Sequence, residues 1–101
     1  MLVEYDFGMD MDIDEGKVVL FVKDYSLPSQ AMEPVIISLS EHYDDIYFVI
    51  VSADELGTLS ENYNIRHCPT ILFLNDGTAL YKIQGVISQN NLKEKIQHIF
   101  Q

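Results

Sequence analysis

Two serines three residues apart, Ser26 and Ser29, stand where a run of strand-forming residues gives way to a helical pattern. Two cysteines with this spacing at a helix N-terminus form a pair suited to disulfide exchange, because the helix terminus favours the thiolate. A serine hydroxyl can cap the helix, but it forms no disulfide and is not an accessible anion at neutral pH. The location is therefore suited to dithiol chemistry, and the side chains that occupy it exclude that chemistry.

Cys68 is the only cysteine among the 101 residues, so no disulfide can form within the chain. Two interpretations of this thiol stay open. It is a monothiol nucleophile that forms mixed disulfides or is glutathionylated, or it is a small apolar residue that fills a packing slot. In the first case an external thiol must resolve the mixed disulfide, since the chain has no second cysteine.

Ser26 or Ser29 with His67 could also form a hydrolytic pair, with the serine as nucleophile and the histidine as base. The chain has no Gly-x-Ser-x-Gly elbow, and no carboxylate can be assigned to orient His67, so helix capping is the favoured role of both serines. The other histidines, His42 and His98, show no metal-ligand spacing with Cys68. We therefore expect no metal site and no cofactor.

The formal net charge is −10, from 16 acidic and 6 basic residues. Such a surface repels phosphate groups, which disfavours binding to nucleic acid or to an anionic membrane. Residues 10–15 faintly resemble a calcium loop but lack its glycine and terminal glutamate, so a solvated acidic segment is favoured. The first residues show no basic and apolar stretches of a signal peptide, and no apolar run approaches a membrane span, so we expect a cytoplasmic protein.

Apolar periodicity predicts an α/β domain. Continuous apolar runs at 17–23 and 46–51 are typical of buried parallel strands. Met32, Val35, Ile36 and Leu39 mark one face of a helix from Ser29 to about His42, in which Pro34 should kink the axis. Strands at 70–74 and 79–83 flank Asn75-Asp76-Gly77-Thr78, a strong hairpin signal.

Two further helices complete the predicted order. Asp54 caps a helix that carries Leu56, Leu59 and Tyr63, although Gly57 weakens its first turn. Ser88 caps the last helix, whose sheet-facing residues are Leu92, Ile96, Ile99 and Phe100. Right-handed crossovers place the first two strands parallel and adjacent, and the hairpin joins the same sheet. We expect residues 1–16 to be a short acidic segment that packs on a domain of residues 17–101, with a short strand at 2–5 and a poorly formed helix.

From about Lys17 to Gln101 the chain resembles the thioredoxin family. Tyr25-Ser26-Leu27-Pro28-Ser29-Gln30 is similar to the family's Trp-Cys-Gly-Pro-Cys-Lys, and Tyr63-Asn64-Ile65-Arg66-His67-Cys68-Pro69-Thr70 is similar to its Tyr-x-Ile-x-x-x-Pro-Thr. The helix-kinking Pro34, the turn at Asn75-Asp76-Gly77 and a glycine at the end of the last strand, Gly85, also match. The resemblance implies a thioredoxin fold, which is a central mixed sheet with a C-terminal antiparallel hairpin and flanking helices. It also implies a cis peptide bond before Pro69.

The chain departs from the family at the positions that serve the dithiol. Ser26 and Ser29 replace the two cysteines, and Tyr25 replaces the tryptophan beside them. Leu20 stands at the position of a buried acidic residue, and Ile50 replaces a nearby lysine. The N-terminal strand and helix of the family are abbreviated here. We therefore expect no dithiol oxidoreductase activity from this sequence.

The family's peptide-binding surface does not depend on the cysteines. In the family, the loop before the cis proline offers backbone groups to an extended substrate segment. In this chain the corresponding surface would consist of Tyr25, Leu27, Pro28, His67, Cys68 and Pro69. The main prediction is therefore a binding or adaptor module for a protein or peptide segment, with no particular oligomeric state implied.

The alternative is a thiol–disulfide oxidoreductase that serves cell redox homeostasis. In one form its native cysteines at positions 26 and 29 have been replaced by serine, and in the other it acts as a monothiol protein through Cys68. The apolar residues Leu20 and Ile50 argue against the first form, because the groups that support a dithiol are also absent.

Overall fold

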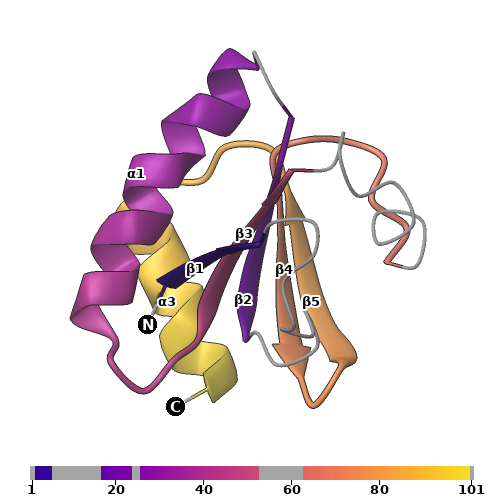
Figure 1. Ribbon diagram of the computed structural model, residues 1–101. Coiled ribbons are helices and arrows are strands. Elements are labelled where there is room, and N and C mark those ends of the chain that lie inside the picture. The colour runs from indigo at the N-terminus through magenta and orange to yellow at the C-terminus, as the bar shows by residue number, and fades with distance from the viewer. Residues whose placement is uncertain (1, 6–16, 24–25, 53–62, 101) are drawn as a thin grey trace.

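A five-stranded mixed sheet forms the centre of the protein in the computed structural model (Figure 1). The structure describes residues 2–5, 17–23, 26–52 and 63–100. The strands lie in the order β1-β3-β2-β4-β5, with the bounds β1 Leu2–Tyr5, β2 Val18–Val22, β3 Phe48–Ser52, β4 Thr70–Asn75 and β5 Thr78–Gln84. β3 runs parallel to both of its neighbours, β1 and β2, whereas β4 runs antiparallel to both β2 and β5. The predicted pairing of the first two buried strands and the short strand at residues 2–5 are confirmed.

Two helices, α1 (Leu27–His42) and α3 (Gln89–Phe100), cover one face of the sheet. Their buried side chains pack with inward-facing residues of β2, β3 and β4 in one apolar cluster, in which the helices contribute Met32, Ile36, Leu39, Leu92 and Ile96. The opposite face of the sheet buries a second cluster, composed of Val19, Phe21, Val49, Val51, Leu72 and Leu74. The central strands are apolar on both faces because both faces are buried. Neither α1 nor α3, the helices of the described part of the chain, is long and apolar enough to cross a bilayer.

The hairpin between β4 and β5 follows the sequence prediction. Asp76 and Gly77 have φ angles of 50° and 80°, so both turn residues occupy the left-handed region. A two-residue turn of this kind matches the twist of antiparallel strands, which is why Asp-Gly is a strong hairpin signal. The register shifts once, between Phe73 and Leu74, so β5 contains one residue more than its partner there.

The helices differ from the predictions in their boundaries. α1 begins at Leu27, two residues before the predicted start, because Ser26 is the N-cap and Pro28 is tolerated in the first turn. Pro34 lies inside α1. The last helix begins as predicted after Ser88, whose hydroxyl accepts a hydrogen bond from the Asn91 N–H at 3.2 Å. The helix predicted after Asp54 and the one predicted within residues 1–16 lie outside the described residues.

Leu20 and Ile50 are direct neighbours across β2 and β3. Leu20 is completely buried and Ile50 nearly so, and both belong to the cluster under α1 and α3. The position that the family resemblance assigns to a buried acid is thus fully apolar, and so is the one it assigns to a lysine. No ionised group needs to be desolvated there, so these positions serve only packing.

An acid restored at position 20 should therefore destabilise the fold. Leu20→Asp buries a carboxylate with no cation beside it, and we expect the free energy of unfolding to fall by about 3–5 kcal/mol. Leu20→Met preserves volume and should cost less than about 1.5 kcal/mol. Urea denaturation of both variants measures the difference. An Asp variant as stable as the Met variant would contradict the assignment of a dry apolar environment.

Candidate functional site

The candidate site lies along the edge of the sheet that is formed by strand ends, where β2 ends and β4 begins. Phe21 pairs with Thr70 in the antiparallel register of these strands, so Lys23 and Pro69 lie at the same edge. The chain that follows β2 leads into α1 at this edge (Figure 1). Pairing of strands thus brings together residues of the two sequence motifs that are about forty positions apart in the chain.

Ser26 caps α1 at this edge. Its backbone is extended, with φ −90° and ψ 119°, and its hydroxyl accepts a hydrogen bond from the Ser29 N–H at 3.4 Å. Its carbonyl accepts the first helical hydrogen bond, from the Gln30 N–H at 3.0 Å. This is the geometry of an N-cap, in which the side chain satisfies a backbone donor that the helix leaves unpaired.

Ser29 joins the helix to the end of β2. Its side chain is 1% exposed, and its hydroxyl accepts a hydrogen bond from the Lys23 N–H at 3.1 Å. Within the described residues neither this hydroxyl nor that of Ser26 bonds to His67, which is exposed. Both serines therefore hold backbone together, in agreement with the capping role that the sequence favours over a hydrolytic one.

The loop before β4 is held at both of its ends. The Cys68–Pro69 peptide bond is cis, and the Pro69 carbonyl accepts a hydrogen bond from the Gly85 N–H at 2.8 Å. The Thr70 hydroxyl donates to the His67 carbonyl. Gly85 has a φ of 90°, a conformation that a side chain would strain. The end of β5 is thereby fixed beside Pro69.

Asn64 anchors the start of the same loop. It adopts a φ of 57°, which asparagine tolerates better than most residues. Its carbonyl accepts a hydrogen bond from the Lys82 ammonium at 3.2 Å, and its side-chain oxygen accepts one from Arg66 Nε at 3.1 Å. The loop is therefore bonded near both of its ends, at Asn64 to Lys82 of β5 and at Pro69 to Gly85, which directly follows β5.

Two large apolar side chains are exposed around this loop. Leu27, in the first turn of α1, is 77% exposed, and Val86, directly after Gly85, is 62% exposed. Because β4 lies between β2 and β5, Pro69 lies between the elements that carry Leu27 and Val86. Sequence reasoning did not identify Val86. The signal that could have found it is its position after Gly85, the residue that ends the last strand.

The other predicted site residues differ in how far the structure exposes them. Pro28 and His67 are exposed at this edge, whereas Pro69 is buried. Cys68 is half-buried and packs against the second apolar cluster, which favours the packing interpretation of its side chain. Tyr25 lies outside the described residues. Among the described residues no group of histidine, cysteine and acidic side chains could hold a metal ion.

Comparison with known proteins places these features in a family. Residues 2–98 match the family model described as Thioredoxin. A thioredoxin H-type from Populus jackii is 34% identical over 87 residues, which are 84% of this chain and 62% of that protein. The thioredoxin-like protein CXXS2 of Arabidopsis thaliana is 34% identical over 68 residues, 67% of this chain and 44% of that protein. The crystal structure of reduced Schistosoma mansoni thioredoxin is similar with a TM-score of 0.80 at 26% identity, covering 98% of each chain.

The chain belongs to the thioredoxin family. Both the family and the fold predicted from the sequence are confirmed. The match with the Populus relative covers less than two thirds of that protein, and the match with the Arabidopsis relative less than half.

Removal of either serine hydroxyl should lower the free energy of unfolding. Ser29→Ala removes the buried hydroxyl that accepts the Lys23 N–H and should cost about 1–3 kcal/mol. Ser26→Ala removes the N-cap and should cost about 1 kcal/mol. The exposed helical neighbour supplies a control, because Gln30→Ala should stay within about 0.5 kcal/mol of the parent. Thermal and urea denaturation measure all three, and a Ser29→Ala variant as stable as Gln30→Ala would refute this bonding role.

Proposed function

We propose that this thioredoxin-family protein is a binding or adaptor module that holds an extended segment of another protein at the edge formed by α1, the Pro69 loop and the end of β5. The observation that carries the proposal is the exposure of Leu27 and Val86 on either side of that loop. Large apolar side chains exposed together around a fixed backbone segment are typical of interaction surfaces.

Backbone recognition would supply affinity at this edge. A loop that is fixed in position by Asn64, Thr70 and Gly85 does not lose much further conformational entropy when it binds. An extended segment can form main-chain hydrogen bonds with such a loop, while Leu27 and Val86 contact its alternate side chains. His67 and Pro28 border the same surface and are exposed to a partner.

Several features support binding rather than redox turnover. The two serine hydroxyls accept backbone hydrogen bonds at the positions where the family resemblance places a dithiol. The Leu20–Ile50 pair supplies neither the acid nor the lysine of that arrangement. These features together favour a scaffold that keeps a recognition surface without a redox couple.

Insulin reduction tests the absence of dithiol chemistry. With dithiothreitol as donor, we expect the chain to reduce insulin no faster than buffer containing the same donor, because Ser26 and Ser29 cannot form and transfer a disulfide. The Cys68→Ser variant should give the same rate. Turnover well above buffer that disappears in Cys68→Ser would overturn this expectation and support the monothiol alternative.

Peptide selection tests the recognition surface. Dodecapeptides selected from a displayed library on the parent protein should bind Leu27→Ser/Val86→Ser at least tenfold more weakly, a loss of about 1.4 kcal/mol or more. Both positions are exposed, so this variant should remain folded. Leu80→Ser supplies the matched control, since it removes an exposed leucine from the opposite end of β5. Titration calorimetry measures the affinities, and equal losses in the two variants would refute this site.

A further inference from the structure

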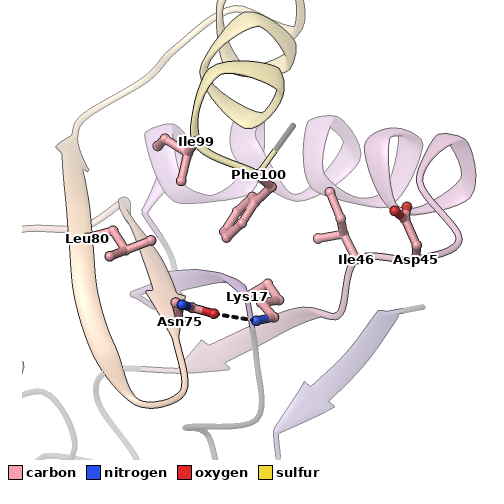
Figure 2. Close-up of a pocket in the computed structure, with 7 residues that line it drawn as sticks. All are labelled: Lys17, Asp45, Ile46, Asn75, Leu80, Ile99 and Phe100. Atoms are coloured by element: carbon pink, nitrogen blue, oxygen red, sulfur yellow. Dashed lines mark hydrogen bonds between the residues drawn. The ribbon is translucent and has the colours of Figure 1, made fainter.

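A hollow of about 340 Å³ lies between the C-terminal end of α3 and the sheet (Figure 2). It is at the end of the sheet where β2 begins and β4 ends, opposite the proposed recognition surface. The β4–β5 hairpin, the last turn of α3 and the residues just before β2 and β3 line it. Its volume is at the low end of the range of ligand sites in proteins, about 300–1,000 Å³, so it suits a small molecule.

The walls of the hollow are apolar and are held in place by packing. Ile46 is 4% exposed and belongs to the apolar cluster under α1 and α3, against which Ile99 and Phe100 also pack. The centre of the Phe100 ring lies 6.2 Å from that of Phe73 in β4. Walls that are already formed need little reorganisation to receive an apolar group.

A β-bulge brings Leu80 to the same hollow. The pairing of β4 with β5 shifts between Phe73 and Leu74, which leaves Leu80 as an extra residue of β5. Tyr81 pairs with Phe73, and the centres of their rings are 6.2 Å apart on the face of the sheet that α3 covers. In a regular strand Leu80 would point to the opposite face from Tyr81. Because of the bulge, Leu80 also lies on the α3 side, where it lines the hollow.

Lys17 is the cationic residue of the lining. Its backbone is fixed from both sides, since its N–H donates to the Tyr47 carbonyl at 2.9 Å and its carbonyl accepts from the Leu74 N–H at 2.8 Å. Its half-buried side chain donates a hydrogen bond of 2.8 Å to the side-chain oxygen of Asn75 (Figure 2). This partner is neutral, so the bond leaves the charge of the ammonium uncompensated. An oxyanion of a ligand can compensate it through the remaining N–H donors.

The Asn75 amide adds a second donor to this polar end of the hollow. Its oxygen accepts from Lys17, so its NH₂ group is a donor on the other side of the amide. Figure 2 shows this nitrogen on the side of Leu80, and the Phe100 ring pointing from α3 toward the Lys17–Asn75 pair. The hollow thus combines two hydrogen-bond donors, one of them charged, with apolar walls.

Two carboxylates lie near this polar end, Asp45 on the rim of the hollow and Asp76 in the hairpin turn. Both are exposed, so water weakens their interaction with other charges. Figure 2 shows Asp45 beyond Ile46 from the Lys17–Asn75 pair. Among the described residues Lys17 bonds Asn75 rather than either carboxylate. These acids disfavour a ligand with a second negative group and leave room for a single one at Lys17.

We propose that this hollow binds a small aliphatic monocarboxylate. The carboxylate accepts hydrogen bonds from the Lys17 ammonium and the Asn75 amide, and the hydrocarbon chain lies against Leu80, Ile99 and Phe100. The site goes beyond the proposed recognition function, because it lies at the other end of the strands and shares no residue with that surface.

A titration with hexanoate tests the proposal. Backbone amide NMR of the full chain should show saturable shifts at residues 17, 75, 80, 99 and 100. Acetate has the same head group without the apolar chain and should bind at least tenfold more weakly. Hexanamide has nearly the same shape without the charge and should also bind at least tenfold more weakly, because hydrogen bonds between charged groups are the stronger ones.

Variants at the polar end separate a specific site from general electrostatics. Lys17→Met keeps the apolar stem and removes the ammonium, so it should weaken hexanoate binding at least tenfold. Lys93→Met makes the same change of charge beside another hollow, which Ser38 and His42 of α1 line, and should change the affinity less than twofold. Asn75→Asp gives Lys17 a carboxylate of the protein itself, which competes with the ligand, and should weaken binding at least tenfold.

Variants at the walls and the rim separate this site from the recognition surface. Leu80→Ser should weaken hexanoate binding, whereas Leu27→Ser/Val86→Ser should leave it unchanged. Asp45→Asn removes a like charge from the rim and should tighten binding. Failure of the selected peptides to bind at the Pro69 loop would leave these expectations intact, so the two proposals can fail independently.

Four outcomes would overturn the proposal. Equal weakening by Lys17→Met and Lys93→Met would mean a non-specific attraction. Hexanamide that binds as tightly as hexanoate would mean that the charge of Lys17 selects nothing. N-acetyl-leucine that binds at least tenfold more tightly than hexanoate would assign the hollow to the C-terminus of a peptide. An unchanged spectrum at millimolar hexanoate, or shifts confined to the Pro69 loop, would mean that the hollow binds no such ligand.

Discussion

The antiparallel pairing of β2 with β4 is the interaction on which the candidate site depends. The register that joins Phe21 to Thr70 places the end of β2 beside the beginning of β4. Lys23 can then donate its N–H to Ser29, and Pro69 can accept a hydrogen bond from Gly85, which directly follows β5. A slip of one residue would turn every side chain of β2 to the other face of the sheet, so the residues that pack in the two apolar clusters would be exchanged and no longer fit their neighbours. The buried apolar residues on both faces of the sheet therefore also fix the positions of the residues at the proposed recognition surface.

The proposed function gives this scaffold a recognition surface without the dithiol reaction. Redox chemistry by a dithiol requires two sulfurs and benefits from groups that move protons. Here hydroxyls and apolar side chains occupy those positions, and each has a structural use: Ser26 caps α1, Ser29 joins it to β2, and Leu20 packs against Ile50. The proposed recognition surface requires only backbone geometry and exposed side chains, and neither depends on a thiolate.

Sequence reasoning identified the strands, the hairpin and both described helices, because long apolar runs and a two-residue Asp-Gly turn carry strong local signals. It placed the start of α1 two residues too late, since the apolar period begins only after the cap and Pro28 are already helical. It missed Val86, because an exposed valine after a strand has no periodic signal. Only the hydrogen bond between Gly85 and Pro69 reveals that this valine lies beside the loop. The packing of Cys68 against the second cluster likewise depends on strands that are distant in sequence.

The central claim is that recognition at this edge is non-covalent and centred on the loop at Pro69. Hydrogen–deuterium exchange of the protein with and without a selected peptide tests this claim most directly. We predict slower exchange at residues 67–70 and 85–86 on binding, to the same extent in the parent protein and in Cys68→Ser, and unchanged by added dithiothreitol. Protection that disappears in Cys68→Ser, or that dithiothreitol abolishes, would contradict the account and assign the interaction to the thiol.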